Sequence, residues 1–268
     1  FAQQLPPIVK YSKDVYNAGI QNWMISQDNH RFMYFANNEG LLEFNGSNWT
    51  LYPSPNETII RSVKVIDDKI FTGCYMEFGY WKRQPSGQLK YTSLSTTIKH
   101  KILDDEQFWT ILNFDHWVLF QSLNRIYVYD TKLKKFNIIS PKGNIIKSFK
   151  TETGLYYQTS NGGLYEIENG KSELITLGGI IANNKVVGVF KNAEGLLLLT
   201  QNKGFFQITG NNTVQVKTNV DSDLVASIVY SCCKLSDGGF VLGTLSNGIF
   251  ILSKEKHLSF HITQNSGL

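Results

Sequence analysis

Short apolar runs alternate with polar turns along the whole chain, and this pattern recurs about every forty residues. In each repeat an apolar run leads into a polar turn, usually with glycine, and a second apolar run follows it. The turns lie near residues 40, 79, 125, 163, 204 and 248. Such a period, built from short strands, is typical of a β-propeller. We therefore predict an all-β propeller with six visible four-stranded repeats, closed by six or seven blades.

The second repeat illustrates the expected unit. Strands are predicted at residues 61–66, 69–73, 79–82 and 88–91. The Asp67-Asp68 and Pro85-Ser86-Gly87 segments between them are typical tight turns, because Pro presets φ and Gly accepts positive φ. The innermost strands of the other repeats are expected to begin near Asn22, Trp109, Ile146, Val186 and Ser227.

The two ends of the chain resemble each other and set the expected domain limits. Pro7-Ile8-Val9-Lys10-Tyr11-Ser12 and Leu258-Ser259-Phe260-His261-Ile262-Thr263 both look like an outermost strand that leads into a turn. We expect residues 1–19 to supply an N-terminal outer strand that closes the propeller. Residues 20–257 hold the repeats, and residues 258–268 are expected to start a further repeat or to form an outer strand. The chain is then expected to be part of a longer repeat array.

Composition narrows the classes of partner. The formal net charge is only +4, and there are four arginines, without the concentrated basic stripe expected of a nucleic-acid binder. No apolar stretch approaches the ~20 residues of a membrane span, so membrane attachment is expected only through segments outside this sequence. Ala2 is consistent with the remnant of a cleaved signal peptide. No Cys/His spacing suits zinc, and we expect neither a cofactor nor a metal.

The repeats resemble a known family. The segments Asn22-Trp23-Met24-Ile25-Ser26-Gln27-Asp28 and Asp237-Gly238-Gly239-Phe240-Val241-Leu242-Gly243-Thr244 resemble the two-component-regulator propeller repeat. The third repeat departs from it, because Arg125 replaces the turn glycine. The segments at residues 52–58 and 74–81 look most like the branch that carries a triple-tyrosine domain, a membrane helix and a LuxR-type DNA-binding domain. The other branch carries a histidine kinase and often senses glycan fragments.

The resemblance implies a periplasmic sensor region of a membrane-spanning regulator from Bacteroidetes-type bacteria, homodimeric in the full-length receptor. Its ligand would be a small molecule, in some members derived from a glycan, or a protein. The output, a kinase or a direct DNA-binding domain, would lie beyond residue 268.

One face of the predicted propeller carries the candidate ligand-binding residues, because the turn between the second and third strands lies beside the link into the next blade. Amides there offer paired donors and acceptors for sugar hydroxyls, and Trp and Tyr offer apolar faces. This suits a neutral polar ligand better than a phosphate. Turn geometry and core packing are the competing explanations for these residues. The candidates are Asn22, Trp23, Asn38, Glu39, Arg61, Tyr75, Glu77, Glu106, Trp109, Gln121 and Asn124.

Catalysis is a weaker hypothesis than binding. A sialidase-like propeller needs clustered arginines for a carboxylate, and only Arg61 and Arg125 map to this face. Glu39, Glu77 and Glu106 could supply a glycosidase pair only if two of them converge. We therefore expect a non-catalytic sensor domain that binds a ligand or partner. The alternatives are a constitutive protein-interaction scaffold and a carbohydrate-active hydrolase or lyase.

Overall fold

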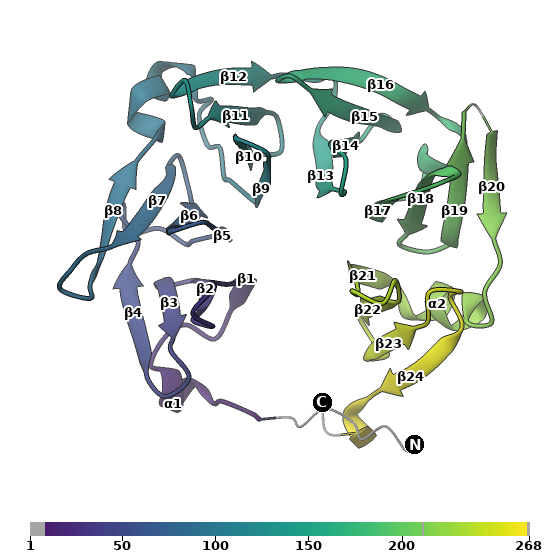
Figure 1. The fold of residues 1–268 in the computed structure, drawn as a ribbon, viewed down its shortest axis with the longest axis horizontal. Helices are drawn as coiled ribbons and strands as arrows, with labels where there is room; N and C mark the ends of the chain where they lie inside the picture. Colours follow the sequence, from purple (N-terminus) through teal and green to yellow (C-terminus); the bar gives the residue numbers. More distant parts are fainter. Residues whose placement is uncertain (1–8, 211, 267–268) are drawn as a thin grey trace. The chain divides into compact units, whose positions relative to one another are not determined.

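The computed structural model describes residues 9–210 and 212–266, and its fold is an all-β, six-blade propeller (Figure 1). Each blade is a four-stranded antiparallel sheet whose strands neighbour one another in chain order. Both the predicted fold class and the predicted number of four-stranded repeats are therefore confirmed.

The first three sheets consist of β1 (Asn22–Gln27), β2 (Met33–Asn37), β3 (Gly40–Phe44), β4 (Trp49–Pro53), β5 (Ser62–Ile66), β6 (Lys69–Gly73), β7 (Phe78–Arg83), β8 (Leu89–Ser93), β9 (Thr110–Phe114), β10 (Trp117–Gln121), β11 (Ile126–Asp130) and β12 (Lys135–Ile139). The other three consist of β13 (Ile145–Lys150), β14 (Leu155–Thr159), β15 (Gly163–Glu168), β16 (Lys171–Leu177), β17 (Val186–Asn192), β18 (Gly195–Thr200), β19 (Gly204–Thr209), β20 (Asn212–Val216), β21 (Val229–Lys234), β22 (Phe240–Thr244), β23 (Ile249–Leu252) and β24 (Leu258–Ile262). Short helices join some of them: α1 (Lys13–Tyr16), η1 (Ser95–Lys101), η2 (Gly179–Ile181), α2 (Asp221–Ser227) and η3 (Gln264–Ser266).

The chain forms two compact units. The N-terminal unit comprises Tyr11–Ser148 with Asn169–Lys171, and the described residues of the C-terminal unit are 9–10, 149–168, 172–210 and 212–266. Each unit has its own core. In the N-terminal unit Phe78 stacks on Phe120 with ring centroids 4.3 Å apart and meets the edge of Phe108 at 4.6 Å. In the C-terminal unit Leu199, Phe205 and Leu242 belong to one buried cluster.

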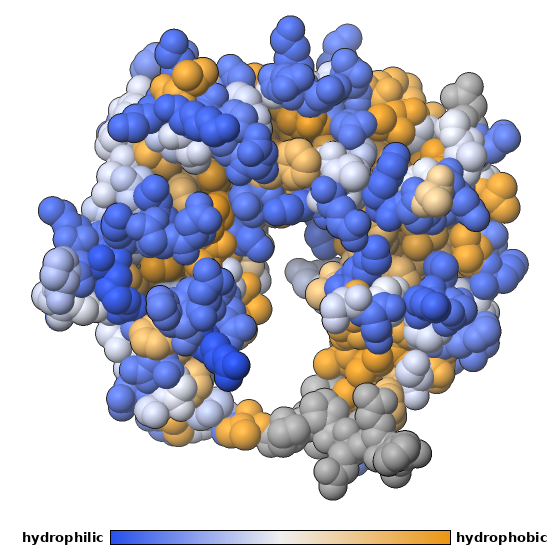
Figure 2. All heavy atoms as spheres, in the orientation of Figure 1, coloured by the Kyte–Doolittle hydropathy of each residue, from blue (hydrophilic) through white to orange (hydrophobic). Residues whose placement is uncertain are grey.

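The apolar runs of the sequence form the second strands of the blades, of which β14 and β18 are buried on both faces. All residues of β14 are buried, and Leu196–Thr200 of β18 are buried as well. A strand covered on both faces loses the alternation of polar and apolar residues and becomes a continuous apolar run. Outer strands such as β20 are mostly exposed. Hydrophilic residues accordingly cover many of the turns on the face shown in Figure 2, and hydrophobic residues appear between them.

The recurrent glycine beside the central turn has a steric cause. A Cβ at Gly40, Gly79 or Gly248 would lie 2.2, 2.2 and 2.1 Å from the carbonyl oxygens of Tyr52, Thr92 and Ile262. These carbonyls belong to the fourth strand or its end, so the glycine lets the outer strand approach closely. Arg125 holds this place in the third repeat, and its guanidinium Nη1 donates to the Lys101 carbonyl at 2.6 Å.

The two ends differ in part from the expected arrangement. Leu258–Ile262 is β24, the fourth strand of the sixth sheet, so the outer-strand alternative fits this segment. Residues 9–12 form no strand, and α1 follows them directly. The ring of Tyr11 packs against Trp49 at 5.3 Å instead of extending a sheet. Residues 1–8 and 267–268, which include Ala2 and the Pro7-Ile8 start of the expected strand, lie outside the described residues.

One inner strand also begins later than expected. Ser227 is the last residue of α2, and β21 starts at Val229. The helix forms because Val220 and Leu224, four residues apart, are both buried in the core of the C-terminal unit. A helix this short leaves too little periodic pattern for a prediction from sequence.

Candidate functional site

Two tryptophans enclose an arginine on the N-terminal unit. The guanidinium carbon of Arg61 lies 4.3 Å from the ring centroid of Trp23 and 4.8 Å from that of Trp109. The two indoles meet edge to face with centroids 6.0 Å apart. Arg61 Nε donates to Gln107 Oε1 at 2.9 Å, and Trp23 Nε1 donates to Asn38 Oδ1 at 2.8 Å. We call Trp23, Asn38, Arg61, Gln107 and Trp109 the Arg61 cluster.

The repeat itself brings these residues together. Trp23 lies on β1, Arg61 directly precedes β5, and Trp109 directly precedes β9. These first strands are neighbours, since β5 contacts both β1 and β9. The Arg61 N–H donates to the Gly73 carbonyl at 2.9 Å, and the Trp109 N–H donates to the Gln121 carbonyl at 2.8 Å. The same backbone bond in successive blades therefore holds both residues at equivalent positions.

The Arg61 cluster is partly open to solvent. Trp23 is 40% exposed, while Arg61 and Trp109 are half-buried. Burial lowers the pKa of Arg61, but an arginine stays protonated at neutral pH. Each contact between a guanidinium and an indole face is worth about 0.5–2 kcal/mol, depending on solvent exclusion. These contacts offset part of the cost of removing the charge from water.

Tyr75 borders the Arg61 cluster through Gln107. Tyr75 and Gln107 form an antiparallel bridge, and Tyr75 is 38% exposed. Its hydroxyl donates to Asp105 Oδ1 at 2.6 Å, and this hydrogen bond raises the pKa of Tyr75. Asn56 Nδ2 donates to the Tyr75 carbonyl at 2.7 Å. Gln107 and Asp105 were not among the candidates from sequence, although Gln107 lies only two residues before Trp109 and so occupies the same link between blades.

Glu77 does not belong to the candidate site, contrary to the expectation from sequence. Its carboxylate accepts hydrogen bonds from Tyr91 at 2.9 Å, from Ser93 at 2.7 Å and from Ser95 at 2.7 Å. Three hydroxyl donors from the outer strand and the segment after it occupy most of the acceptor sites of this carboxylate. Glu77 therefore fixes the fourth strand of its blade.

Glu106 is also structural, and Gln121 is buried, with no hydrogen-bond partner for its Oε1 among the described residues. Glu106 is only 2% exposed, and its carboxylate accepts from Ser122 Oγ at 2.6 Å, from the Leu103 N–H at 3.1 Å and from the Tyr127 hydroxyl. Gln121 is 3% exposed. These side chains face the protein interior, where they cannot meet a ligand. Glu77 and Glu106 are engaged separately, each with its own hydroxyl donors, so these two do not form the converging pair that the glycosidase alternative requires.

Of the remaining candidates, Asn22 is the first residue of β1, and Glu39 and Asn124 lie in turns. Asn22 Oδ1 accepts from Asn37 Nδ2 at 2.8 Å, which ties it to the end of β2. The Glu39 N–H donates to Asn37 Oδ1 at 3.0 Å, and the Asn124 N–H donates to Ser122 Oγ at 3.2 Å. The side chains of Glu39 and Asn124 are exposed. Local hydrogen bonds account for these three positions, and of the eleven candidates only Trp23, Asn38, Arg61 and Trp109 belong to the Arg61 cluster.

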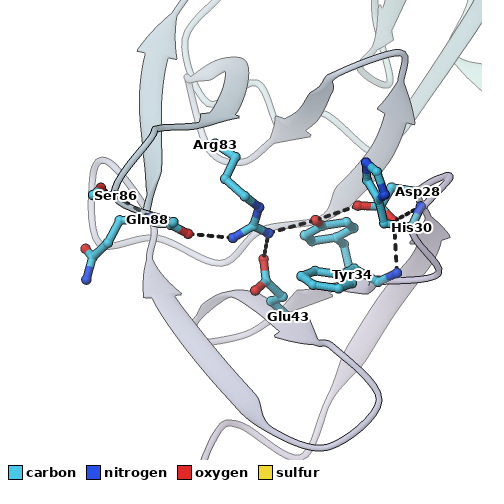
Figure 3. A network of polar contacts seen from close by, with 9 residues as sticks. Asp28, His30, Tyr34, Glu43, Arg83, Ser86 and Gln88 are labelled. Carbon is cyan, nitrogen blue, oxygen red and sulfur yellow. Dashed lines mark hydrogen bonds and ion pairs between the residues drawn. The ribbon is translucent and has the colours of Figure 1, made fainter.

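A second arginine of the N-terminal unit has a closed environment. The Arg83 guanidinium lies between Glu43 and Tyr34 (Figure 3). Arg83 Nη2 donates to the Glu43 carboxylate and, at 3.0 Å, to the Tyr34 hydroxyl, while Nη1 donates to the Gly87 carbonyl at 2.6 Å. The Tyr34 hydroxyl donates in turn to Asp28 Oδ2 at 3.0 Å. This Arg83 network, Asp28, Tyr34, Glu43 and Arg83, joins the first two blades.

The C-terminal unit holds a groove of about 770 Å³ at the ends of β13, β17 and β21. Its lining includes Lys150, Lys191 and Lys234, and Lys234 Nζ pairs with Glu152 Oε1 at 3.2 Å. None of the candidates from sequence lines this groove. In the part of the chain that the structure describes, no group of three or more His, Cys, Asp or Glu side chains could hold a metal ion. No helix within residues 9–210 and 212–266 is long and apolar enough to cross a membrane.

Neither a protein-family model nor a curated protein matches the sequence. Among solved structures, the chain is similar to the extracellular domain of a putative hybrid two-component system from B. thetaiotaomicron, with a TM-score of 0.63 and 19% identity. That match covers 88% of this chain but 32% of the other. The chain thus spans about a third of the length of that neighbour.

Two further similarities come from other classes of protein. The WD40 propeller domain of Doa1 matches with a TM-score of 0.64 and 14% identity, covering 87% of this chain and 79% of the other. A chain of the mitotic checkpoint complex matches with a TM-score of 0.66 and 12% identity, covering 98% and 86%. At such identities the similarities establish the propeller fold, and a fold of this kind serves many functions.

Proposed function

We propose that this chain is a non-catalytic ligand-recognition propeller of an extracytoplasmic sensor region, and that its ligand binds at the Arg61 cluster. The observation that carries the proposal is the cluster itself: an arginine in contact with two indoles, partly open to solvent, without a counter-ion among the described residues. Exposed aromatic and arginine side chains of this kind are enriched at binding sites. An exposed tryptophan beside an arginine without a counter-ion is not what stability alone would favour.

The repeat pattern favours a receptor over the other classes that share the fold. The resemblance to the two-component-regulator propeller repeat and the fold shared with the B. thetaiotaomicron extracellular domain both support a sensor of this type. In such a receptor the chain would lie in the periplasm, and the membrane helix and output domain would lie in other segments. Ligand binding would then alter how two protomers associate, and so pass the signal across the membrane.

The environment of the carboxylates favours binding over catalysis. A glycosidase needs two carboxylates on either side of the scissile bond, about 5–9.5 Å apart. Glu77 and Glu106 are each held by hydroxyl donors, and Glu106 is buried. Neither is available to protonate a leaving group.

A thermal-shift screen tests the proposal. The chain would be heated with a library of oligosaccharides, amino acids and small metabolites, because a ligand that binds only the folded state raises the melting temperature. A ligand at about 100 times its Kd adds about 2.7 kcal/mol, which corresponds to a shift of about 5 °C or more. Trp109→Ala should abolish the shift for the ligand identified.

Trp117→Ala is the matched control, because Trp117 is also half-buried but lies at the start of β10, outside the Arg61 cluster. Its shift should equal that of the wild type. A shift that survives Trp109→Ala would place the ligand elsewhere on the chain. No shift across the library would contradict a small-molecule sensor and favour a protein partner.

A further inference from the structure

The donors of the Arg61 guanidinium are only partly used. Nε donates to Gln107, but no described residue accepts a hydrogen bond from Nη1 or Nη2, and no described carboxylate forms an ion pair with Arg61. The Trp23 and Trp109 rings contact the guanidinium from two adjacent sides, since their centroids lie 4.3 and 4.8 Å from its carbon and 6.0 Å from each other. The two terminal nitrogens are therefore a preorganised pair of donors, the fork that matches a carboxylate.

The two amides of the Arg61 cluster are oriented as further donors. Asn38 uses its carbonyl oxygen to accept from the Trp23 indole N–H, and Gln107 uses its carbonyl oxygen to accept from Arg61 Nε. An indole N–H and a guanidinium N–H can only donate, so the amide atom facing each of them must be the oxygen. The NH2 group of each amide then points away from that hydrogen bond and is free to donate. No described residue accepts from Asn38 Nδ2, Gln107 Nε2 or Trp109 Nε1. The cluster thus offers more free donors than acceptors, since each amide oxygen keeps only one of its two lone pairs.

The net charge of the Arg61 cluster favours a ligand with a single negative charge. Arg61 is its only cation, and the nearby Asp105 carboxylate, bonded to Tyr75, adds negative charge on the side of Gln107. A phosphate carries up to two negative charges and is usually held by several cationic or backbone donors. One guanidinium balances one carboxylate.

We propose that the ligand of the Arg61 cluster is a ring-containing carboxylic acid. Its carboxylate accepts from Arg61 Nη1 and Nη2, and the apolar face of its ring lies against the exposed indole of Trp23. This inference rests on the proposed function, because it specifies the ligand of the same site. It replaces the neutral polar ligand that the amide-rich sequence predicts, because the cation of Arg61 has no counter-ion among the described residues and favours an anion.

Matched pairs of probes test this inference by titration calorimetry at low salt. One pair is the methyl glycoside of D-galacturonic acid and its 6-amide, and the other is hippurate and its amide, so that the two arms separate an acidic sugar from an aromatic acid. Inorganic phosphate is the third probe. At least one carboxylate should bind the wild type about tenfold or more tightly than its amide, since truncating one partner of a charge-assisted pair has an effect of this order.

Arg61→Gln should reduce the ratio between acid and amide to about one, and Arg61→Lys should retain part of it, because a lysine keeps the charge but loses the fork. Arg31→Gln is the control, since Arg31 is exposed in the turn between β1 and β2 and should leave the ratio unchanged. Circular dichroism and urea unfolding verify that each variant is folded.

Three outcomes would overturn the inference: equal binding of acid and amide, tighter binding of phosphate than of either carboxylate, or no binding of any probe. The first two leave the proposed function intact, provided that binding still depends on Trp109. In the third case the library screen with Trp109→Ala decides separately whether the chain is a small-molecule sensor at all.

Discussion

The two arginine sites of the N-terminal unit lie at opposite ends of the second sheet and differ in chemistry. Arg61 precedes β5 and Arg83 ends β7, but both are half-buried and both contact side chains of the first blade. Arg83 meets a carboxylate, a phenol and a carbonyl, whereas Arg61 meets two indoles and one amide. The first site is complete within the protein, and the second leaves its strongest donors unused.

Electrostatics distinguishes the same two sites. Burial opposes the charge of Arg83, but the hydrogen bond and the charge of Glu43 outweigh it and raise the pKa of Arg83. Burial alone acts on Arg61 and lowers its pKa. Removing a cation from water without a counter-ion lowers the stability of the fold, and nothing in the propeller fold requires it. The comparison teaches that the partners of a charged group, more than its burial, separate a structural arginine from a binding arginine.

Breaking the Arg83 network should have the largest effect on stability. Arg83→Met leaves the Glu43 carboxylate, whose side chain is 6% exposed, without its cation. Removing one member of a buried pair costs about 3–5 kcal/mol, and because Arg83 itself is partly exposed we expect about 2–3 kcal/mol. Urea unfolding at pH 7 measures the loss.

Lys82→Met on the same strand is the control for that prediction. Lys82 pairs with Asp68 at 2.7 Å, but both side chains are more than half exposed, at 53% and 59%. An exposed pair contributes about 0–1 kcal/mol. Equal losses from Arg83→Met and Lys82→Met would contradict the structural role of the Arg83 network.

Glu77→Gln should have a smaller effect and should sharpen the distinction between structural and binding residues. The amide keeps one acceptor oxygen but replaces the other with a donor that faces hydroxyl groups. We expect a loss of about 1–2 kcal/mol in urea unfolding. The Kd of a ligand that depends on Trp109 should stay within about twofold of the wild type. A selective loss of binding would return Glu77 to the ligand site.

Alkaline pH should have the smallest effect on the free energy of unfolding. Burial raises the pKa of Tyr34, Tyr127 and Tyr156, the last to about 12. Because these values are above the ordinary pKa of about 10, the stabilisation is complete below pH 10 and is lost as pH rises through the folded-state values. The free energy of unfolding should begin to fall near pH 9, because burial raises the pKa of the Cys74 thiol to about 12, and should fall further above pH 9.5, by less than about 1 kcal/mol per tyrosine at pH 10.5. The free energy of unfolding of Tyr156→Phe should fall less steeply with pH than that of the wild type. An identical slope would contradict the contribution of Tyr156.

Local pattern was sufficient to predict most of the fold. The glycine-containing turns and the apolar second strands recur in register, so β5 and β6 were placed to within one residue of their observed bounds. The short helices α1 and α2 could not be predicted, because each is stabilised by packing: Tyr16 contacts Trp49, and Leu224 enters the core.

The candidate site was predictable only in part. Trp23, Arg61 and Trp109 occupy similar places in successive repeats. The repeat pattern therefore predicts that they lie on the same face. The roles of Glu77 and Glu106 depend on partners 14–21 residues away, Tyr91 and Tyr127 among them. Those contacts depend on strand register and on side-chain direction, which the spacing of residues does not specify.

The most direct test compares the two arginines in one spectrum. The four arginine Nε–H signals of a 15N-labelled chain can be assigned with Arg→Lys variants and followed while the methyl glycoside of D-galacturonic acid or hippurate is added. The account predicts that the Arg61 signal and the Trp109 indole signal shift with ligand concentration, while the Arg83 signal does not move. A ligand that stabilises the protein but leaves the Arg61 signal unchanged, or moves that of Arg83 instead, would contradict it.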